Sequence, residues 1–272
     1  MTTLLPACDT LLLERTGSVL FLTLNRPQVR NAINSKMWDE IERVFSAIAP
    51  DRSIKVVVLR GAAGVFCAGG DISERSSLRD IGTDKDDPVA LRNRRAGHIF
   101  TQIDNAPQAV VAVVESYALG GGFGLACVAD ITIAAADVKF GLPEVTLGLV
   151  PAQILPFLLR RIGSAQLRRL ALTAARIGAD EALRIGLVQE VCADASALEE
   201  KLSQILAQLE RGGPVAIATA KQVIAMARDL PDETLLDSTS QILAGLVRSA
   251  EGIEGALAFK EKRTPHWQTS RS

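Results

Sequence analysis

Short uninterrupted apolar runs recur through the first half of the chain. Those at 55–60 and 109–114 have the length and composition of strands that are buried on both faces. The runs at 11–14 and 19–25 are separated by Thr16-Gly17-Ser18, which predicts a hairpin-like start. The pattern therefore predicts a sheet that opens with a paired hairpin and continues into buried strands.

Segments with helical periodicity lie between these runs. Apolar residues recur every three or four positions over 35–49, and further helical stretches follow at 90–104 and 122–129. Another strand is predicted at 131–135. Strands that alternate with helices favour parallel pairing and right-handed crossovers, so the predicted fold class is α/β. The Ser-, Asp- and Arg-rich segment 73–95 is predicted to be a mobile loop that runs into the second helix.

From Ala152 onward the pattern is almost wholly helical. Pro214 and Pro231 stand where first-turn prolines are tolerated, which supports two of the helix starts. Helices are predicted at 153–162, 164–174, 179–186, 195–211, 214–229, 232–249 and 251–261. We therefore divide the chain into a β-rich core over residues 1–205 and a helical region over residues 206–272, with no linker-like composition between them.

Composition excludes several classes of protein. The 272 residues include 30 Lys and Arg against 31 Asp and Glu, which argues against nucleic acid as the main partner. Two histidines and four scattered cysteines offer no metal-ligand spacing, so no metal site is predicted. The N-terminus has no signal-like pattern, and no window reaches the roughly 18 apolar residues of a membrane span. We expect a cytoplasmic protein without a membrane segment.

Two glycine-bearing segments follow buried strands and carry the candidate chemistry. They are Val65-Phe66-Cys67-Ala68-Gly69-Gly70-Asp71 and Ala118-Leu119-Gly120-Gly121-Gly122-Phe123-Gly124. Small residues at such points let a main-chain N–H approach a ligand closely. Two N–H groups that face one carbonyl oxygen form an oxyanion hole, which stabilises an enolate beside a thioester. Downstream, Glu144 in Phe140-Gly141-Leu142-Pro143-Glu144 supplies a single acid/base group for such chemistry.

The ordered set of motifs resembles the enoyl-CoA hydratase/isomerase (crotonase) superfamily over nearly the whole chain. Besides the segments above, the elements that carry the resemblance are Leu24-Asn25-Arg26-Pro27, Arg30-Asn31-Ala32, Gly148, Pro151, Gly186-Leu187-Val188 and Phe259-Lys260-Glu261-Lys262-Arg263. The resemblance implies a ClpP/crotonase-type spiral of ββα units with a C-terminal helical trimerisation region. It also implies an acyl-CoA thioester substrate, with CoA as part of that substrate and no separate cofactor, and assembly as a homotrimer or hexamer.

Residue roles also follow from the resemblance. The two oxyanion-hole N–H groups map to Ala68 and Gly121, and the acid/base maps to Glu144. Arg30 would lie near the CoA phosphates, and Lys262 would arrive from a neighbouring subunit. For both, an exposed position without a role is an equal alternative. The residues implied to bind CoA are Ala68, Gly69, Gly70, Asp71, Arg30 and Lys262.

Gly124 departs from the pattern of the family's hydratases, which usually carry a first glutamate there in addition to the later one. Two carboxylates can hold a water between them, but here only Glu144 remains. A single base suits double-bond migration and resembles the family's isomerases. Hydration stays open, because a substrate with its own carboxylate could help to hold the water in the space that Gly124 leaves. That space would also accept a branched acyl group.

The run Pro151-Ala152-Gln153-Ile154-Leu155-Pro156-Phe157 predicts an unusual acyl pocket. Gln153 would hydrogen-bond a water or a distal carboxylate, or else be an ordinary polar residue at a helix start. With Arg160-Arg161-Ile162-Gly163 after it, the run is similar to that of hydratases of acyclic terpenoid breakdown, which act on isohexenylglutaconyl-CoA. Hydration of this branched substrate leads narrowly over isomerisation. A non-catalytic CoA-binding protein is the third hypothesis.

Other polar residues have a plainer interpretation. His98 lies on a predicted helix, where a structural role is more common than a catalytic one. The basic run of Arg92, Arg94 and Arg95 is typical of a solvated helix face, although a CoA phosphate or a substrate carboxylate is a minority alternative. Asp71 would either line the pocket or cap the turn that follows it.

Overall fold

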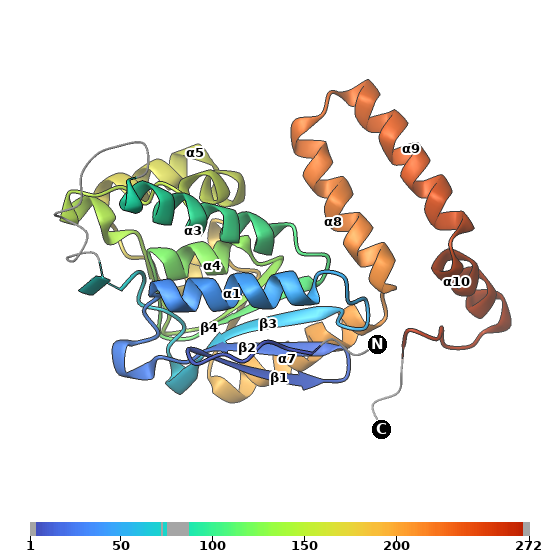
Figure 1. The fold of residues 1–272 in the computed structure, drawn as a ribbon, viewed down its shortest axis with the longest axis horizontal. Coiled ribbons are helices and arrows are strands. Elements are labelled where there is room, and N and C mark those ends of the chain that lie inside the picture. The colour runs from blue at the N-terminus through green and yellow to red at the C-terminus, as the bar shows by residue number, and fades with distance from the viewer. Residues whose placement is uncertain (1–3, 72, 75–86, 269–272) are drawn as a thin grey trace.

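The computed structural model describes residues 4–71, 73–74 and 87–268, which form two sheets covered by helices (Figure 1). In the larger sheet the strand order is β1-β2-β3-β4-β6-β8. The first pair is antiparallel and every later pair is parallel, as the alternation of strands and helices predicts. The strands are β1 (Leu11–Thr16), β2 (Val19–Leu24), β3 (Val56–Gly61), β4 (Ala109–Val114), β6 (Ile131–Ala135) and β8 (Glu190–Cys192).

Both faces of this sheet are buried because its central strands are largely apolar. Val57 and Leu59 of β3 pack into the core under α1 (Ser35–Ile48), α3 (Pro88–Asp104) and α4 (Gly121–Val128). Val56 and Val58 face the opposite way, toward α7 (Ala195–Glu210). The helices accordingly lie on two sides of the sheet (Figure 1). Successive side chains of a strand point to opposite faces, so an unbroken apolar run serves both layers.

A second, smaller sheet brings the two glycine segments together. It consists of β5 (Tyr117–Leu119) and β7 (Lys139–Gly141), which are parallel. Isolated bridges extend it on both sides, joining Ile33 to Gly70, Cys67 to Ala118, and Phe140 to Ile177. The remaining short elements are the 3-10 turns η1 (Pro27–Val29), η2 (Ala62–Gly64) and η3 (Pro143–Leu147). The glycine segments, the 30–33 loop and Glu144 on η3 therefore lie around one small sheet.

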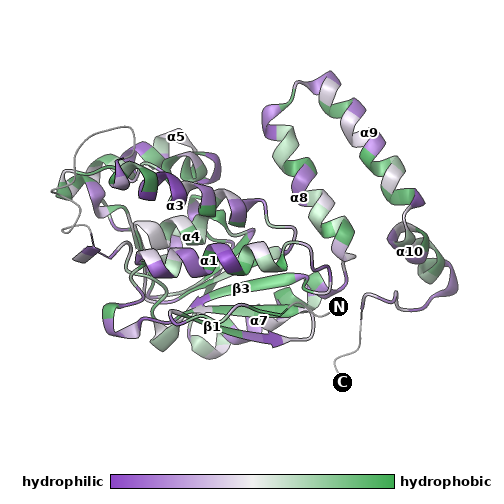
Figure 2. Ribbon diagram, viewed as in Figure 1, coloured by the Kyte–Doolittle hydropathy of each residue, from purple (hydrophilic) through white to green (hydrophobic). Residues whose placement is uncertain are grey.

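The C-terminal helices form an arm that extends away from the sheets (Figure 1). In α8 (Pro214–Asp229) and α9 (Asp232–Arg248) no residue is buried, and α10 (Ala250–Glu261) buries only Ala258. Hydrophobic residues recur along the three helices (Figure 2). Those with large exposed side chains are Val215, Ile224, Leu236, Leu243, Val247, Ile253, Leu257 and Phe259. A monomer would leave this apolar surface in water.

Two buried or half-buried lysines attach the arm to the core. Lys55 is 5% exposed, and its Nζ donates to the carbonyls of Glu210 and Gly212, at 3.0 and 3.3 Å, and to that of Trp267 at 2.5 Å. Burial lowers the pKa of Lys55. Lys221 of α8 pairs with Asp130 at 2.6 Å and donates to the carbonyl of Gln108 at 2.9 Å. The base of the arm is thus fixed.

The predicted elements are confirmed with a few differences. The expected pair of helices at 153–162 and 164–174 appears as α5 (Leu155–Thr173), which Gly163 interrupts with a φ of 73°. α6 (Ala179–Arg184) is shorter than predicted, and the three-residue strands β5 and β8 were not predicted. α3 begins at Pro88, and the part of the expected mobile loop at residues 75–86 lies outside the described residues. The expected boundary at 205/206 falls inside α7, whereas the arm begins after Gly212-Gly213.

Candidate functional site

The first glycine segment pairs as a short strand with the loop at 30–33. The Ala68 N–H donates to the Arg30 carbonyl at 3.0 Å, and the Ile33 N–H donates to the Gly69 carbonyl at 2.8 Å. The Asp71 N–H then donates to the Ile33 carbonyl at 2.9 Å. In a parallel bridge of this kind the residue between the two bonds, Gly70, directs its own N–H to the other side. Within the described part of the chain, that N–H has no acceptor.

The second glycine segment presents a matching group at the start of α4. Gly121 is the first residue of the helix, where an N–H has no intrahelical partner and the helix dipole is positive. Gly120 donates its N–H to the Gly141 carbonyl at 2.9 Å, but no acceptor among the described residues takes the Gly121 N–H. A Cβ built on Gly121 would lie 4.0 Å from the Gly70 nitrogen. The Gly70 and Gly121 N–H groups therefore border the same space.

This geometry corrects the sequence-based assignment of Ala68. Its N–H is engaged by the Arg30 carbonyl, so the expectation that Ala68 contributes the first amide donor is wrong for this fold. Gly70, two residues further on, has the N–H that faces Gly121. Ala68 instead fixes the strand that presents Gly70, and the role of Gly121 as the second donor stays a prediction.

Glu144 lies beside these two N–H groups. It is the second residue of η3 and is 7% exposed. A Cβ on Gly120 would come within 2.6 Å of Glu144 Oε1, so the carboxylate packs directly over this glycine. Gly120 also has a φ of 48°, a conformation that suits glycine. Glycine at position 120 thus both makes the turn and leaves room for the carboxylate next to Gly121.

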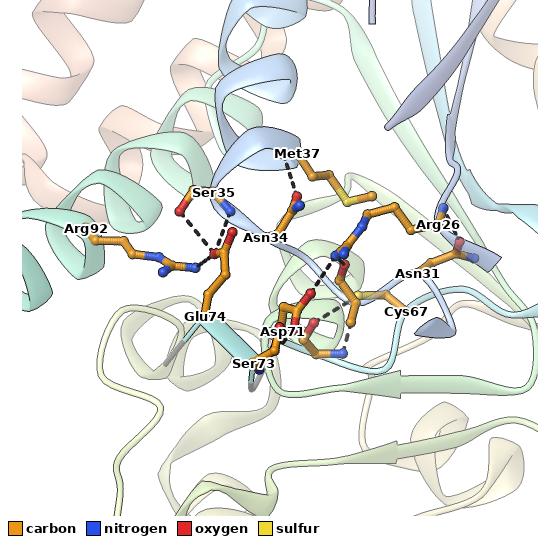
Figure 3. Close-up of polar contacts among 12 residues, drawn as sticks. Arg26, Asn31, Asn34, Ser35, Met37, Cys67, Asp71, Ser73, Glu74 and Arg92 are labelled. Carbon is orange, nitrogen blue, oxygen red and sulfur yellow. Dashed lines mark hydrogen bonds and ion pairs between the residues drawn. The ribbon is translucent and has the colours of Figure 1, made fainter. Parts of the chain in front are cut away.

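Asp71 has a structural role in these contacts (Figure 3). Its carboxylate accepts from the Ser73 N–H at 3.0 Å and the Ser73 hydroxyl at 2.6 Å, and it pairs with Arg26 at 2.9 Å. The Ser73 hydroxyl and Arg26 hold the pKa of Asp71 below its usual range. Arg26 also donates to the Ala32 carbonyl at 2.6 Å. The turn-capping alternative is therefore confirmed. The pair of Asp71 and Arg26 also links the first glycine segment to the loop at 30–33, with which Gly70 is paired.

Gly124 does not leave the space that the sequence suggested. A Cβ at this position would lie 2.5 Å from Ile154 Cγ2 and 2.8 Å from Phe100 Cζ. Phe100 packs in turn against Phe157, with ring centroids 6.0 Å apart. The expectation that a water or a branched acyl group occupies the place of the missing carboxylate is wrong. Two buried apolar side chains from distant elements fill it.

We expect that Gly124→Glu destabilises the protein and does not improve catalysis. Overpacking against Ile154 and Phe100 should lower the free energy of unfolding by about 1–3 kcal/mol. Chemical denaturation measures this change, and the double variant Gly124→Glu/Ile154→Ala should lose less stability than the sum of the two single variants, because one of the clashing side chains is then shortened. A Gly124→Glu protein as stable as the original would show that there is space for a glutamate side chain at position 124, which contradicts this prediction.

The family-model comparison matches residues 14–270 to the enoyl-CoA hydratase/isomerase family. The chain belongs to this family. The solved structure of AtuE from Pseudomonas aeruginosa is 50% identical, with a TM-score of 0.93, and the match covers 96% of this chain and 100% of that one. An enoyl-CoA hydratase/isomerase structure from Marinobacter aquaeolei is 43% identical, with a TM-score of 0.94 and the same coverage. The protein is thus an enzyme-family member with the crotonase fold.

A relative of known name is the 2,3-dehydroadipyl-CoA hydratase of Escherichia coli strain K12. It is 33% identical over 259 residues, which cover 95% of this chain and 98% of that protein. The resemblance inferred from the motifs is therefore confirmed at the level of the family, as is the crotonase fold.

The other binding residues predicted for this enoyl-CoA hydratase/isomerase family member are either engaged elsewhere or exposed. Gln153 donates from Nε2 to Asn93 Oδ1 at 2.8 Å and packs over Gly97, so its amide is engaged with α3. Arg30 is exposed beside the first glycine segment. Lys262 is exposed at the end of α10, in the arm. Roles for Arg30 and Lys262 in binding CoA stay predictions.

Two arginines of the basic run make ion pairs, which differs from the solvated helix face that the sequence favoured. Arg92 pairs with Glu74, whose carboxylate also accepts from Ser35 at the start of α1 (Figure 3). Arg95 pairs with residues of α1 as well, and His98 is exposed on α3. These pairs join α3 to α1, which is a structural use of the run.

Metal and membrane features add nothing to this site. No group of three or more His, Cys, Asp or Glu side chains in the described ranges could hold a metal ion. Within the same ranges, no helix combines the length and apolarity needed to cross a membrane. The expectation that the enzyme needs no metal or redox cofactor stays a prediction.

Proposed function

We propose that this protein is an acyl-CoA hydratase that adds water to a branched unsaturated acyl-CoA. The observation that carries the proposal is the position of the buried Glu144 carboxylate beside the Gly70 and Gly121 N–H groups, which no acceptor in the described ranges engages. Two amides that grip one thioester oxygen stabilise the negative charge that develops there. A carboxylate next to them is placed to move a proton to or from the carbons beside the carbonyl.

A single carboxylate suffices for the reaction if it acts twice. Glu144 first takes a proton from a water whose oxygen adds to the β-carbon, and the electrons of the double bond move onto the thioester oxygen as an enolate. The Gly70 and Gly121 amides hold that oxygen. Protonated Glu144 then returns the proton to the α-carbon, which restores the carbonyl. The net change is addition of one water across the double bond, and the carboxylate ends as it began.

The name of the E. coli relative, 2,3-dehydroadipyl-CoA hydratase, favours hydration. For the acyl group we retain isohexenylglutaconyl-CoA as the specific hypothesis, because of the similarity of residues 151–163 to hydratases of acyclic terpenoid breakdown. The apolar surroundings formed by Ile154, Phe100 and Phe157 are compatible with a branched hydrocarbon group. The distal carboxylate of this substrate would have to hydrogen-bond the water at a place other than the filled position at Gly124.

Double-bond migration is the second candidate, and the packing at Gly124 favours it. Ile154 and Phe100 close the position from which a second carboxylate would hold the water. Glu144 alone could remove a proton from one carbon of the acyl chain and return it to another through a dienolate on the same two amides. A non-catalytic CoA-binding protein is the third candidate, although the buried Glu144 beside the two amides argues against it.

Turnover in labelled water separates the three candidates. With H₂¹⁸O and a panel of short, branched and glutaconyl-type enoyl-CoA esters, we expect mass spectrometry to find one ¹⁸O atom in the product. Isomerisation in ²H₂O would incorporate solvent hydrogen but no solvent oxygen. Binding of CoA esters without oxygen incorporation or hydrogen exchange for any ester would support the non-catalytic protein and contradict our proposal.

We further propose that the arm of α8, α9 and α10 assembles the protein as a homotrimer or hexamer. What supports this is the exposure of Phe259, Leu236 and Leu243, together with the groove lined by Leu246, Ile253 and other apolar residues between α9 and α10. A single-chain mass in analytical ultracentrifugation would contradict it. A cytoplasmic location remains an expectation from the sequence.

A further inference from the structure

We propose that Trp38 determines acyl specificity by forming an aromatic wall of the acyl site, which favours acyl groups that are planar and unsaturated next to the thioester. The inference rests on the proposed function, because it takes the space beside the Gly70 and Gly121 amides as the place of the thioester. It concerns a residue that the sequence did not single out. Trp38 lies on α1, next to the buried Met37.

The geometry of Gly121 places Trp38 at the site. In a helix the Cα–Cβ bond tilts toward the N-terminus, where the free N–H groups of the first turn also point. A Cβ built on Gly121 would lie 3.9 Å from Trp38 Cζ2, 3.5 Å from Ile33 Cδ1 and 4.0 Å from the Gly70 nitrogen. One small volume at the N-terminus of α4 is therefore bordered by the indole edge, the Ile33 side chain and both amides.

Trp38 is supported from behind by a row of aromatic rings. Its indole meets Phe100 edge to face, with centroids 5.1 Å apart and planes at 77°. Phe100 packs over Gly124 beside Ile154, and it also contacts Phe157. Position 124 lies one turn after position 121 on α4, and glycine at position 124 lets Phe100 approach the helix closely. These contacts hold the Trp38 side chain in place.

The burial of Trp38 leaves part of the residue exposed. Trp38 packs against the buried core but is itself only partly buried. Ile154 and Phe100 fill the position over Gly124, so we infer that the acyl group extends from the thioester past Trp38 instead. Aromatic rings attract flat unsaturated groups through stacking and dispersion. A planar enoyl thioester therefore fits this wall better than a saturated chain does.

The test uses the fact that the chain has only two tryptophans. In a Trp267→Phe/Glu144→Gln protein Trp38 is the sole tryptophan, and turnover does not disturb the titration. We expect but-2-enoyl-CoA and 3-methylbut-2-enoyl-CoA to change its fluorescence saturably, butanoyl-CoA to do so more weakly, and CoA alone not to do so. Calorimetry on the same samples establishes binding independently.

Kinetics on the active protein give the second readout. Trp38→Ala should lower kcat/KM for 3-methylbut-2-enoyl-CoA by about 2- to 12-fold, the usual range for an aromatic contact, whereas Trp38→Phe should retain most of it. Calorimetric binding of the enoyl esters with unchanged Trp38 emission would overturn the assignment of Trp38 alone. Absence of any CoA-ester binding would overturn the proposed function, and the assignment with it.

Discussion

Glu144→Gln is expected to lower kcat by about 10²- to 10⁴-fold, the range that a positioned general acid/base contributes. Glutamine has nearly the same shape as glutamate, so it should fit over Gly120 where the carboxylate packs now. It cannot take a proton from water or return one to carbon. Steady-state kinetics measure the loss, and calorimetry should find affinity for the CoA ester largely unchanged.

The matched control is Glu14→Gln, which makes the same chemical change at an exposed position of β1. It should leave kcat and the melting temperature as they are. If Glu144→Gln keeps kcat within about tenfold of the unchanged protein while the control behaves as expected, Glu144 is not the acid/base.

Gly121→Pro is expected to lower kcat/KM by about 10²- to 10³-fold, the usual cost of losing one oxyanion-hole donor. Proline lacks the N–H, and it is tolerated as the first residue of a helix, where its fixed φ fits. Gly121 is that first residue, and its φ is not in the positive range. The substitution therefore removes the proposed donor with little damage to α4.

Gly121→Ala controls for the Cβ that both substitutions add at this position. Alanine keeps the N–H, and its Cβ would meet nothing closer than Ile33 Cδ1 at 3.5 Å, an ordinary contact. We expect this variant to retain most of the activity. Equal losses in the alanine and proline variants would mean that steric exclusion at Gly121 is responsible, and the amide would lose its proposed role.

The sequence predicted where the two glycine segments lie along the chain but not how the first of them pairs with the loop at 30–33. Apolar runs followed by glycines placed both segments after buried strands, as the structure has them. Whether Ala68 or Gly70 offers its N–H depends on the register with Ile33, which belongs to a loop far away in the sequence. Side-chain and N–H directions alternate along a strand, so the donor cannot be chosen until the partner of that strand is known.

Three further features could not be predicted from the sequence. The sequence alone does not show whether a glycine leaves a cavity or makes room for a neighbouring side chain. At Gly124 the neighbours are Phe100 of α3 and Ile154, which directly precedes α5. Trp38 comes directly after Met37 but is not one of the apolar residues that define the buried face of α1. Helical periodicity therefore did not assign it a role. The strands β5 and β8, with three residues each, are too short to show a period.

A crystal structure of the Glu144→Gln protein with an unreacted enoyl-CoA tests the central claim most directly. We predict the thioester oxygen within about 2.7–3.1 Å of both the Gly70 and the Gly121 nitrogens. The substituted side chain at position 144 should lie beside the α- and β-carbons. A thioester oxygen bound to the Ala68 nitrogen, or to neither glycine, would contradict the account.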